Sequence, residues 1–298
     1  MNGILNVDKP SGPSSFQIVA LVRRLSGERR VGHAGTLDPM ATGVLPVCLG
    51  QATRVVEFFG GMTKRYVAEI ELGVETDTYD VTGQVTRRGD LAAIGRERLE
   101  EVLPAFRGQI QQIPPMYSAV KHRGKPFYTL ARAGIEIERR PRIADIHRLE
   151  LVAFHSPLVT LDIVCGKGTY IRSLAHDIGR MIGCGAAMHS LIRMRYGPFE
   201  RSDALSVEKL TAAFRLGNWR DMLQSPDCVL THLPSVVLGS EAENNMKMGR
   251  TLTPIEVTGT RPAAEAEAGI KVGQCRAYAL DGRFVGVLRF NAGNGFWH

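Results

Sequence analysis

The chain of 298 residues has no long hydrophobic run. Its longest stretch without a charged residue, 39–53, is interrupted by Pro39, Gly43, Pro46 and Gly50, whereas a membrane-spanning helix needs about 20 consecutive apolar residues. The first ten residues also lack the basic segment followed by an apolar segment that marks a secretory signal. We therefore expect a cytoplasmic protein that makes no contact with a membrane.

The chain also has little cysteine and no clustered metal ligands. None of the cysteines forms a C-x-x-C pair, and the eight histidines form no H-x-x-x-H or Cys/His cluster. Disulfide frameworks and zinc sites need such clusters. The sequence therefore predicts no metal site and buried free thiols at Cys48, Cys165, Cys184, Cys228 and Cys275.

What is present is a globular composition with an excess of basic residues. The chain is 44% hydrophobic and 22% charged, which excludes a disordered, collagen-like or coiled-coil protein. Lys and Arg number 37 against 30 Asp and Glu, a net charge of +7. Such an excess indicates a polyanionic partner, usually a nucleic acid, although many basic proteins bind none.

The basic residues are concentrated in the segment 121–142. It carries seven Lys or Arg against two acidic residues, and Tyr117, Phe127 and Tyr128 are interleaved with them. Such a run is typical either of a solvated face or of an RNA-binding surface, where cations contact phosphates and aromatic rings stack on unpaired bases. The seven are Lys121, Arg123, Lys125, Arg132, Arg139, Arg140 and Arg142.

Hydrophobic periodicity and turn residues divide the chain into two domains. We expect helices over 15–26, 96–106, 171–181 and 206–216, and strands over 66–72 and 161–165. The segment 217–233 has no periodicity and carries Pro226, which predicts a linker. Beyond it, the strands 236–238, 275–280 and 284–288, the last two joined by Asp281-Gly282, predict a small all-β module with a loop over 263–268. The predicted domains are 1–230 and 231–298.

One loop combines residues that could perform chemistry. The segment 32–39 reads Gly-His-Ala-Gly-Thr-Leu-Asp-Pro. Taken alone, an aspartate before a proline is typical of a turn or helix cap, and a single histidine is typical of a hydrogen-bonded polar residue. The glycines match neither a P-loop nor a dinucleotide fingerprint. Spacing alone does not decide what Asp38 and His33 do.

Several segments, in order, resemble one enzyme family. The stretch GHAGTLDPMATGVLP at 32–46 is similar to the active-site motif of the bacterial tRNA pseudouridine-55 synthases, and the resemblance is strong over about 1–200 and weaker from about 232. Met194 stands where the family usually has threonine. The other matching segments are NVDKPSG at 6–12, KRYVA at 64–68, DTYDVTG at 77–83, PPMYSAVK at 114–121, YTLARAG at 128–134, GKGTYIRSLAHDIG at 166–179 and LIRMRYGPF at 191–199.

The resemblance implies an α+β fold and a small β-domain. The fold expected for residues 1–230 is that of a pseudouridine synthase, a mixed and largely antiparallel sheet with flanking helices and a central cleft. Residues 231–298 are expected to form a PUA-like RNA-binding domain, and 120–142 an insertion that grips RNA. The implied activity is isomerisation of a tRNA T-loop uridine at position 55. No cofactor is expected, because this isomerisation neither gains nor loses atoms or electrons.

The resemblance also implies roles for individual residues. Asp38 is expected to be the nucleophile, acting on C1′, on C6, or by assisting departure of the base. Arg172 is expected to keep it ionised, although Arg172 lies off the apolar stripe of its helix and alone would indicate a surface residue. Tyr66 is expected to stack on the uracil and is a candidate acceptor of the C5 proton; on periodicity alone it is a packing residue.

Further residues are expected to bind the RNA. His33 resembles the wedge that replaces the flipped nucleotide, and Tyr170 and Leu191 match positions that line the uracil pocket. Lys9 is expected to contact phosphate or to support the pocket. From the insertion, the resemblance and the charge count favour contacts to RNA by Lys121, Lys125 and Arg132.

Three other functions compete with this interpretation. A tRNA-folding chaperone or assembly factor on the same fold would bind RNA without turnover, and Asp38, Tyr66 and Arg172 together count against it. A guide-RNA-directed relative like dyskerin is disfavoured by the insertion over 120–142 and by the lack of a long Lys-rich tail. A metal-dependent nuclease lacks a carboxylate cluster. We therefore expect a monomer that needs no protein partner.

Overall fold

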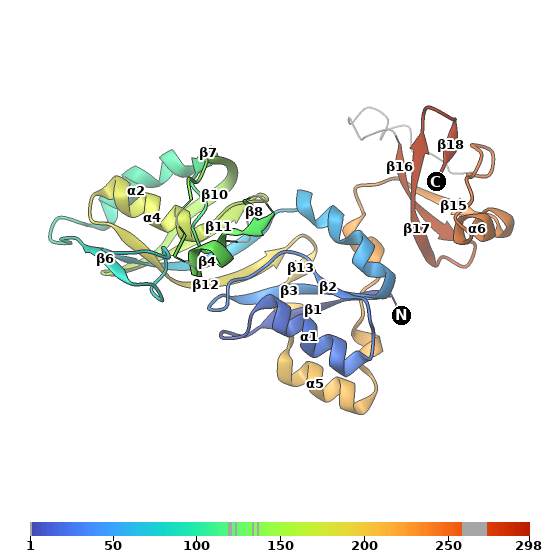
Figure 1. Cartoon of the computed structure of the whole chain (residues 1–298), viewed down its shortest axis with the longest axis horizontal. Helices are drawn as coiled ribbons and strands as arrows, with labels where there is room; N and C mark the ends of the chain where they lie inside the picture. The colour runs from blue at the N-terminus through green and yellow to red at the C-terminus, as the bar shows by residue number, and fades with distance from the viewer. Residues whose placement is uncertain (1, 119–120, 123, 133, 136, 258–272) are drawn as a thin grey trace.

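The computed structural model describes residues 2–118, 121–122, 124–132, 134–135, 137–257 and 273–298. They form a larger part, built on one long sheet, and a smaller C-terminal sheet set to one side of it (Figure 1). Within these ranges, no helix has both the length and the apolar character that crossing a membrane requires.

The larger part is organised by a ten-stranded sheet with mixed strand directions. Most neighbouring strands are antiparallel, and only β1 with β14 and β3 with β12 are parallel, which confirms the expected largely antiparallel sheet. The strands in spatial order are β14 (Leu205–Ser206), β1 (Gly3–Lys9), β3 (Thr42–Leu49), β12 (Ala186–Tyr196), β4 (Lys64–Leu72), β11 (Leu158–Cys165), β10 (Arg142–His155) and β7 (Gly108–Gln112), with β13 (Phe199–Glu200) beside β12 and β2 (Val31–His33) beside β3.

The expected strands form because one face of each is apolar. In β4, Tyr66, Ala68, Ile70 and Leu72 are buried, and the residues between them are only partly buried. This alternation places one row of side chains in the core. Gly43 in β3 allows the close approach of β12, because a Cβ there would lie 2.2 Å from the carbonyl oxygen of Arg193. Its φ of +99° also favours glycine.

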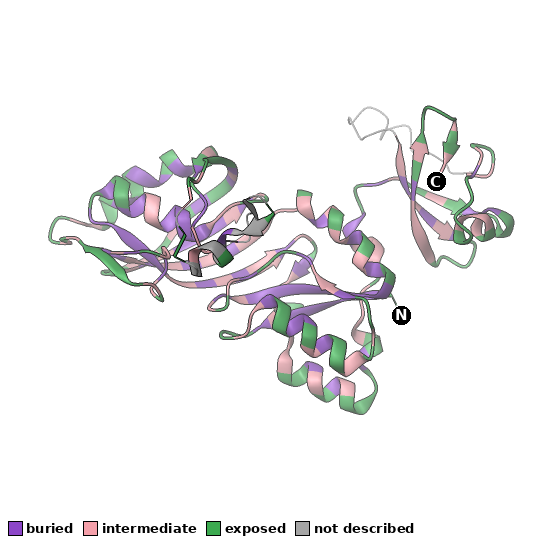
Figure 2. Cartoon of the chain, in the orientation of Figure 1, coloured by how far each residue is buried: buried purple, intermediate pink, exposed green. Residues whose placement is uncertain are grey.

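Helices cover the sheet in the positions that periodicity predicted. α1 (Ser15–Ser26) begins at the N-cap Ser14 with a capping box and ends at Gly27 in the left-handed region, as expected for its sequence. α1 and α5 (Val207–Leu216) pack against β1 and β3. α2 (Arg96–Val102), with the 3₁₀ helix η2 (Leu103–Phe106), and α4 (Ile171–Ile182) pack on the strands β4, β10, β11 and β12. The strands β1 and β3, next to α1 and α5, are almost entirely buried (Figure 2).

The expected linker over 217–233 is wrong. This segment contains the 3₁₀ helices η4 (Trp219–Met222) and η5 (Pro226–Val229). Trp219, Val229, Leu230 and Leu233 are buried in the cores next to β1, β3 and η1 (Gly50–Gly61). Short 3₁₀ segments leave no helical or strand period in the sequence, and the apolar residues bury themselves without one.

The C-terminal module contains the expected strands and one helix that was not predicted. Its four-stranded sheet runs β15 (Ser235–Leu238), β16 (Gln274–Ala279), β17 (Phe284–Asn291) and β18 (Phe296–Trp297). The loop 280–283, which contains the predicted Asp281-Gly282, joins β16 and β17 as a hairpin. The helix α6 (Ser240–Lys247) packs one buried residue, Ala242, against this sheet. The expected loop over 263–268 lies outside the described residues.

The remaining elements are short and lie near the loops of the large sheet. The insertion expected to grip RNA contains a two-stranded hairpin and a one-and-a-half-turn helix. The elements are β5 (Val74–Thr76), β6 (Val85–Arg88), β8 (Lys121–His122), β9 (Lys125–Pro126), α3 (Phe127–Arg132) and the 3₁₀ helix η3 (Arg201–Asp203).

Candidate active site

Asp38 lies on the loop between β2 and β3, and the surrounding residues fix this loop from two sides. The Ser15 hydroxyl accepts from the Leu37 amide at 2.8 Å and donates to the Leu37 carbonyl at 3.1 Å. Lys9, which is fully buried, donates from Nζ to the carbonyl oxygens of Pro10, Pro39 and Ala41 at 2.7–3.0 Å. An ammonium has three protons to donate, so none of them is left for a phosphate.

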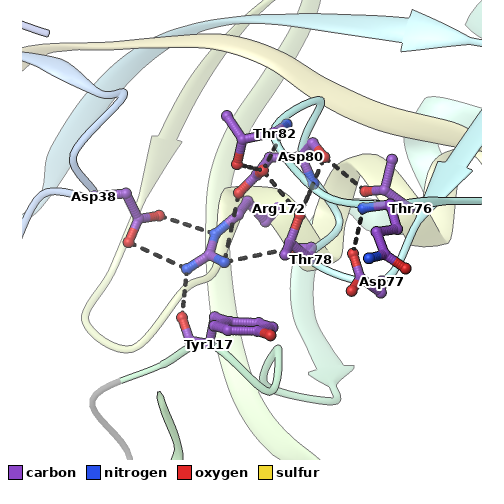
Figure 3. Close-up of polar contacts among 9 residues, drawn as sticks. Asp38, Thr76, Asp77, Thr78, Asp80, Thr82, Tyr117 and Arg172 are labelled. Atoms are coloured by element: carbon purple, nitrogen blue, oxygen red, sulfur yellow. Dashed lines mark hydrogen bonds and ion pairs between the residues drawn. The ribbon is translucent and has the colours of Figure 1, made fainter. Parts of the chain in front are cut away.

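Arg172, on the first turn of α4, forms an ion pair with Asp38 from the other side (Figure 3). Its Nε lies 2.9 Å from Oδ2 of Asp38, and its Nη2 donates to Oδ1 at 3.1 Å. This two-point contact fixes the carboxylate in the plane of the guanidinium. Arg172 is only 5% exposed, so the surface position that the helical stripe indicated is wrong, because loops distant in the sequence cover it.

A second carboxylate, Asp80, contacts the same guanidinium. Its Oδ2 lies 3.6 Å from Nη1 of Arg172. Its other oxygen accepts from the Thr78 hydroxyl, the Thr82 hydroxyl and the Thr82 amide at 2.5–3.0 Å. One cation therefore lies between two carboxylates, of which Asp80 is buried and hydrogen-bonded, whereas the Asp38 side chain is 33% exposed.

Two backbone carbonyls complete the surroundings of Arg172. Nη1 donates to the Thr78 carbonyl at 3.3 Å, and Nη2 donates to the Tyr117 carbonyl at 2.8 Å. Tyr117 lies shortly before the insertion 120–142. The amide of Tyr170 and the side chain of Gln112 are also joined by a hydrogen bond of 3.1 Å. The root of the insertion and the ion pair are thus parts of one hydrogen-bonded network.

The electrostatics of Asp38 differ from those of an ordinary surface aspartate. Burial raises the pKa of Asp38 above its usual 3.8, the Arg172 guanidinium opposes this rise, and the neighbouring Asp80 charge reinforces it. Burial also lowers the pKa of Lys9 to about 8, against the attraction of Asp38. The Asp38 carboxyl is therefore partly desolvated, and the Arg172 guanidinium is the largest favourable influence on its charged form.

Tyr66 and Leu191 lie beside this loop in the same apolar cluster as Leu37. Tyr66 is paired across the sheet with Arg193. Burial raises the pKa of the Tyr66 hydroxyl, although the Arg193 charge opposes the rise. The phenol is therefore uncharged near neutral pH.

Arg193 is a buried cation that sequence reasoning missed. It is 1% exposed, and its nitrogens donate to the carbonyls of Val44, Thr36 and Gly35 at 2.7–3.4 Å. Through the last two bonds it holds the first half of the Asp38 loop, as Lys9 holds the second half. Its place in the segment 191–199 was the only signal, because an arginine on a strand gives no sign of burial.

The other predicted residues lie around the loop at different depths. His33 ends β2 and is partly buried, and burial lowers its pKa, so the ring is neutral near pH 7. Tyr170 is the N-cap residue of α4, directly before Ile171, and burial raises its pKa. For Lys121, Lys125 and Arg132 the structure describes the backbone and not the side chains. The structure therefore brings Lys9, Asp38, Tyr66 and Arg172 to one place and leaves the insertion contacts untested.

A cavity of the structure lies away from the Asp38 loop. Among the described residues, no group of three or more His, Cys, Asp or Glu side chains is placed to hold a metal ion. A cavity of about 1110 Å³ lies between η1, the segment 223–226 and the C-terminal module, and none of Lys9, His33, Asp38, Tyr66, Tyr170, Arg172 and Leu191 lines it. The side chains that the structure gathers at Asp38 include a guanidinium, Arg172, and a phenol, Tyr66.

Comparison with solved structures relates this fold to pseudouridine synthases. A crystal structure of a Cbf5-Nop10-Gar1 complex matches 97% of this chain and 78% of the other, with 29% identity and a TM-score of 0.73. An H/ACA RNP bound to a substrate RNA containing 2′-deoxyuridine matches the same shares with 25% identity and a TM-score of 0.70. The fold class expected from the sequence is confirmed.

Comparison of sequences defines the family. Residues 23–171 match the N-terminal domain of the TruB family pseudouridylate synthases, and residues 172–256 match the tRNA pseudouridylate synthase B C-terminal domain. A tRNA pseudouridine synthase B of Dehalococcoides mccartyi is 46% identical over all of this chain and 95% of the relative. One of Symbiobacterium thermophilum is 45% identical over 81% of this chain and 80% of the relative. The chain belongs to the TruB family.

Proposed function

We propose that this chain isomerises uridine to pseudouridine in the T-loop of tRNA, at position 55, with Asp38 as the nucleophile. The observation that carries the proposal is the two-point ion pair between Asp38 and Arg172 on a loop held by Lys9 and Arg193. The relatives of nearly equal length that carry the name tRNA pseudouridine synthase B support the substrate.

The chemistry needs a carboxylate and no net redox change. The N1–C1′ bond breaks, the uracil turns, and a C5–C1′ bond forms. C5 loses a proton, and N1 of the product carries one, so atoms and electrons balance. Asp38 supplies the negative charge that assists the first step. Arg172 keeps Asp38 ionised in spite of its burial, and a guanidinium suits this role because it keeps its own charge when it is desolvated.

Three residues are suited to bind the flipped nucleotide or to replace it in the RNA: Tyr66, Leu191 and His33. A neutral phenol and an apolar side chain provide surfaces on which a base packs, and each stacked base contributes roughly 1–3 kcal/mol. A neutral His33 ring can fill the space that the uridine leaves. Because burial raises the pKa of Tyr66, its hydroxyl serves better as a hydrogen-bonding group than as a free phenolate base. Lys9, with all its protons on carbonyls, supports the loop instead of contacting phosphate.

The remaining proposals concern RNA recognition and assembly. The insertion, through Lys121, Lys125 and Arg132, grips the T-arm, and residues 231–298 form a second RNA-binding domain. T-loop recognition depends on loop shape and phosphates more than on duplex sequence. The Cbf5 structures are complexes with other proteins, whereas we propose that this chain acts alone, as a monomer in the cytoplasm.

The decisive experiment uses the purified protein with unmodified tRNA and no additive. Chemical mapping of pseudouridine should show one modified position, in the T-loop. The Asp38→Asn variant, which is nearly isosteric, should give no product and bind tRNA with unchanged affinity. Product formation by Asp38→Asn would refute the assigned nucleophile, and RNA binding by the wild-type protein without any product would favour a chaperone.

A further inference from the structure

Tyr79 has an unusual backbone conformation within the motif 77–83. Among the residues that the structure describes, it is the only one other than glycine with a positive φ, at 65°. The left-handed region is unfavourable for bulky side chains, and such a residue persists only where its surroundings hold it. The motif suggested no role for Tyr79.

The two neighbours of Tyr79 are both partners of Arg172. The Thr78 carbonyl accepts from Nη1 of Arg172 at 3.3 Å, and the Asp80 carboxylate lies 3.6 Å from the same nitrogen. Figure 3 shows Thr78 and Asp80 approaching the guanidinium from one loop. The turn at residue 79 therefore directs a carbonyl that precedes it and a side chain that follows it to one atom of Arg172.

The side chain of Tyr79 supplies the contact that holds this turn. Its ring stacks on His176 with the centroids 4.0 Å apart and the planes 13° from parallel. His176 lies four residues after Arg172, on the adjacent turn of α4. The stack therefore fixes the loop to the same helix that carries the guanidinium. Burial lowers the pKa of His176, which keeps the ring uncharged near neutral pH.

Tyr79 also contacts Arg139, which lies near the end of the basic segment. The Arg139 guanidinium is 5.8 Å from the ring centroid, and its Nη1 donates to the Tyr79 hydroxyl at 3.4 Å and to the Pro114 carbonyl at 3.3 Å. The Tyr79 side chain therefore contacts both a residue of α4 and a cation of the insertion. The backbone is held as well, because the Met188 amide donates to the Tyr79 carbonyl at 3.0 Å.

We propose that Tyr79 is a positioning residue: its ring, stacked on His176, holds the left-handed turn that directs Thr78 and Asp80 to Arg172, and so sets the geometry of the Arg172–Asp38 pair. The proposal rests on the proposed function, because it assumes that this pair performs the isomerisation. Tyr79 itself touches no reacting atom, and it acts through Arg172.

The test compares Tyr79→Ala, Tyr79→Phe and His176→Ala with the wild-type protein in single-turnover isomerisation of tRNA. Tyr79→Ala should lower the rate roughly tenfold, about 1.4 kcal/mol, with tRNA affinity unchanged. His176→Ala removes the α4 partner of the same stack and should also lower the rate. Tyr79→Phe keeps the ring and should restore the wild-type rate.

The pH dependence separates positioning from general stability. The charged groups that face Asp38 are Arg172, Asp80 and Lys9. If the turn loosens, Arg172 stabilises the carboxylate less, and the acidic limb of the rate profile should move to higher pH in Tyr79→Ala and not in Tyr79→Phe. An unchanged limb, an unchanged rate, or a parallel loss of affinity and rate would overturn the proposal. Absence of product with the wild-type protein would instead refute the proposed function.

Discussion

Two clusters of arginine and aspartate in the described part of the chain are arranged in opposite ways. At Asp38, one guanidinium lies between two carboxylates. At Asp162, on β11, one carboxylate lies between two guanidiniums: Arg65 contacts it at 2.6 Å and Arg148 at 2.9 Å. Both clusters join strands or loops distant in the sequence, yet only one of them has the properties of an active site.

The difference lies in the charge balance around each carboxylate. Burial acts to raise the pKa of Asp162, but the hydrogen bonds from Arg65 and Arg148 outweigh it and hold the pKa below 3.8. At Asp38 burial wins over Arg172, helped by the Asp80 charge, and the pKa is raised. Asp162 is only 9% exposed, whereas Asp38 keeps 33% of its side-chain surface. Two cations thus lower the pKa of Asp162, whereas a single cation shared with Asp80 leaves the pKa of Asp38 raised.

The largest expected effect distinguishes the arginines of the two clusters. Arg172→Lys removes the two-point contact to Asp38 and the bonds to Thr78 and Tyr117, and misplacement of a reacting group by about 1 Å costs roughly 100-fold in rate. We expect a loss of that size in single-turnover isomerisation. The matched control, Arg65→Lys, keeps a cation beside Asp162 and should leave the rate unchanged. Equal losses in both variants would show that the clusters do not differ in function.

Asp162→Asn should change stability and not catalysis. It removes the charge that holds Arg65 and Arg148, whose side chains are 41% and 43% exposed and can be solvated by water. We therefore expect the free energy of unfolding to fall by only about 1 kcal/mol. Urea denaturation measures this change, and the rate per folded molecule serves as the control. A fall in that rate would argue that the two clusters are coupled.

Acidification should inactivate the enzyme before it disrupts the Asp162 cluster. Asp38 must be ionised, and its folded pKa lies above 3.8, so the rate should fall as the pH drops through a value higher than 3.8. Asp162 has a folded pKa below 3.8, so its contribution to stability is present above 3.8 and is lost only as the pH falls through the lower value. A rate profile and urea midpoints measured over the same pH range test the order. Simultaneous loss of rate and stability would contradict it.

The smallest effect concerns binding and leaves both clusters intact. Neutralising Lys125 and Arg132 together should weaken tRNA binding and reduce the slope of log K against log salt by about 1–2, since each phosphate contact contributes about 0.7–0.9. The isomerisation rate at saturating tRNA should stay unchanged. If the slope does not change, these two side chains face solvent and the basic segment grips RNA elsewhere.

The sequence predicted the elements that bury one regular face. α1, β4 and α4 each have an apolar stripe, and Ser14 and Gly27 mark the ends of α1. α6 escaped prediction because its only buried residue is Ala242, and a polar helix has no stripe. The segment 217–233 was misassigned because its buried side chains follow no period. A hydrophobic pattern in the sequence therefore predicts burial only where the helix or strand is long and buries one face.

The site could be predicted only in part, and only through the resemblance. Asp38 and Arg172 are 134 residues apart, and the residues next to each of them in the sequence give no indication that the two side chains form an ion pair. Arg172 lies off the apolar stripe of α4 and is nevertheless buried, because the loops that carry Asp38, Thr78 and Tyr117 cover it. Asp80 and Arg193 stood within matching segments, but the hydrogen bonds that give them a function come from elements far away in the chain.

The hydrogen-bonding capacity of Arg172 is taken up by partners within the protein. A guanidinium has five polar hydrogens, and all three of its nitrogens already face oxygen atoms of Asp38, Thr78, Asp80 or Tyr117. An incoming phosphate could recruit this arginine only by displacing one of those internal ligands. Under the proposed function, the tRNA is therefore anchored by other cations, and its affinity can change without disturbing the Arg172–Asp38 pair.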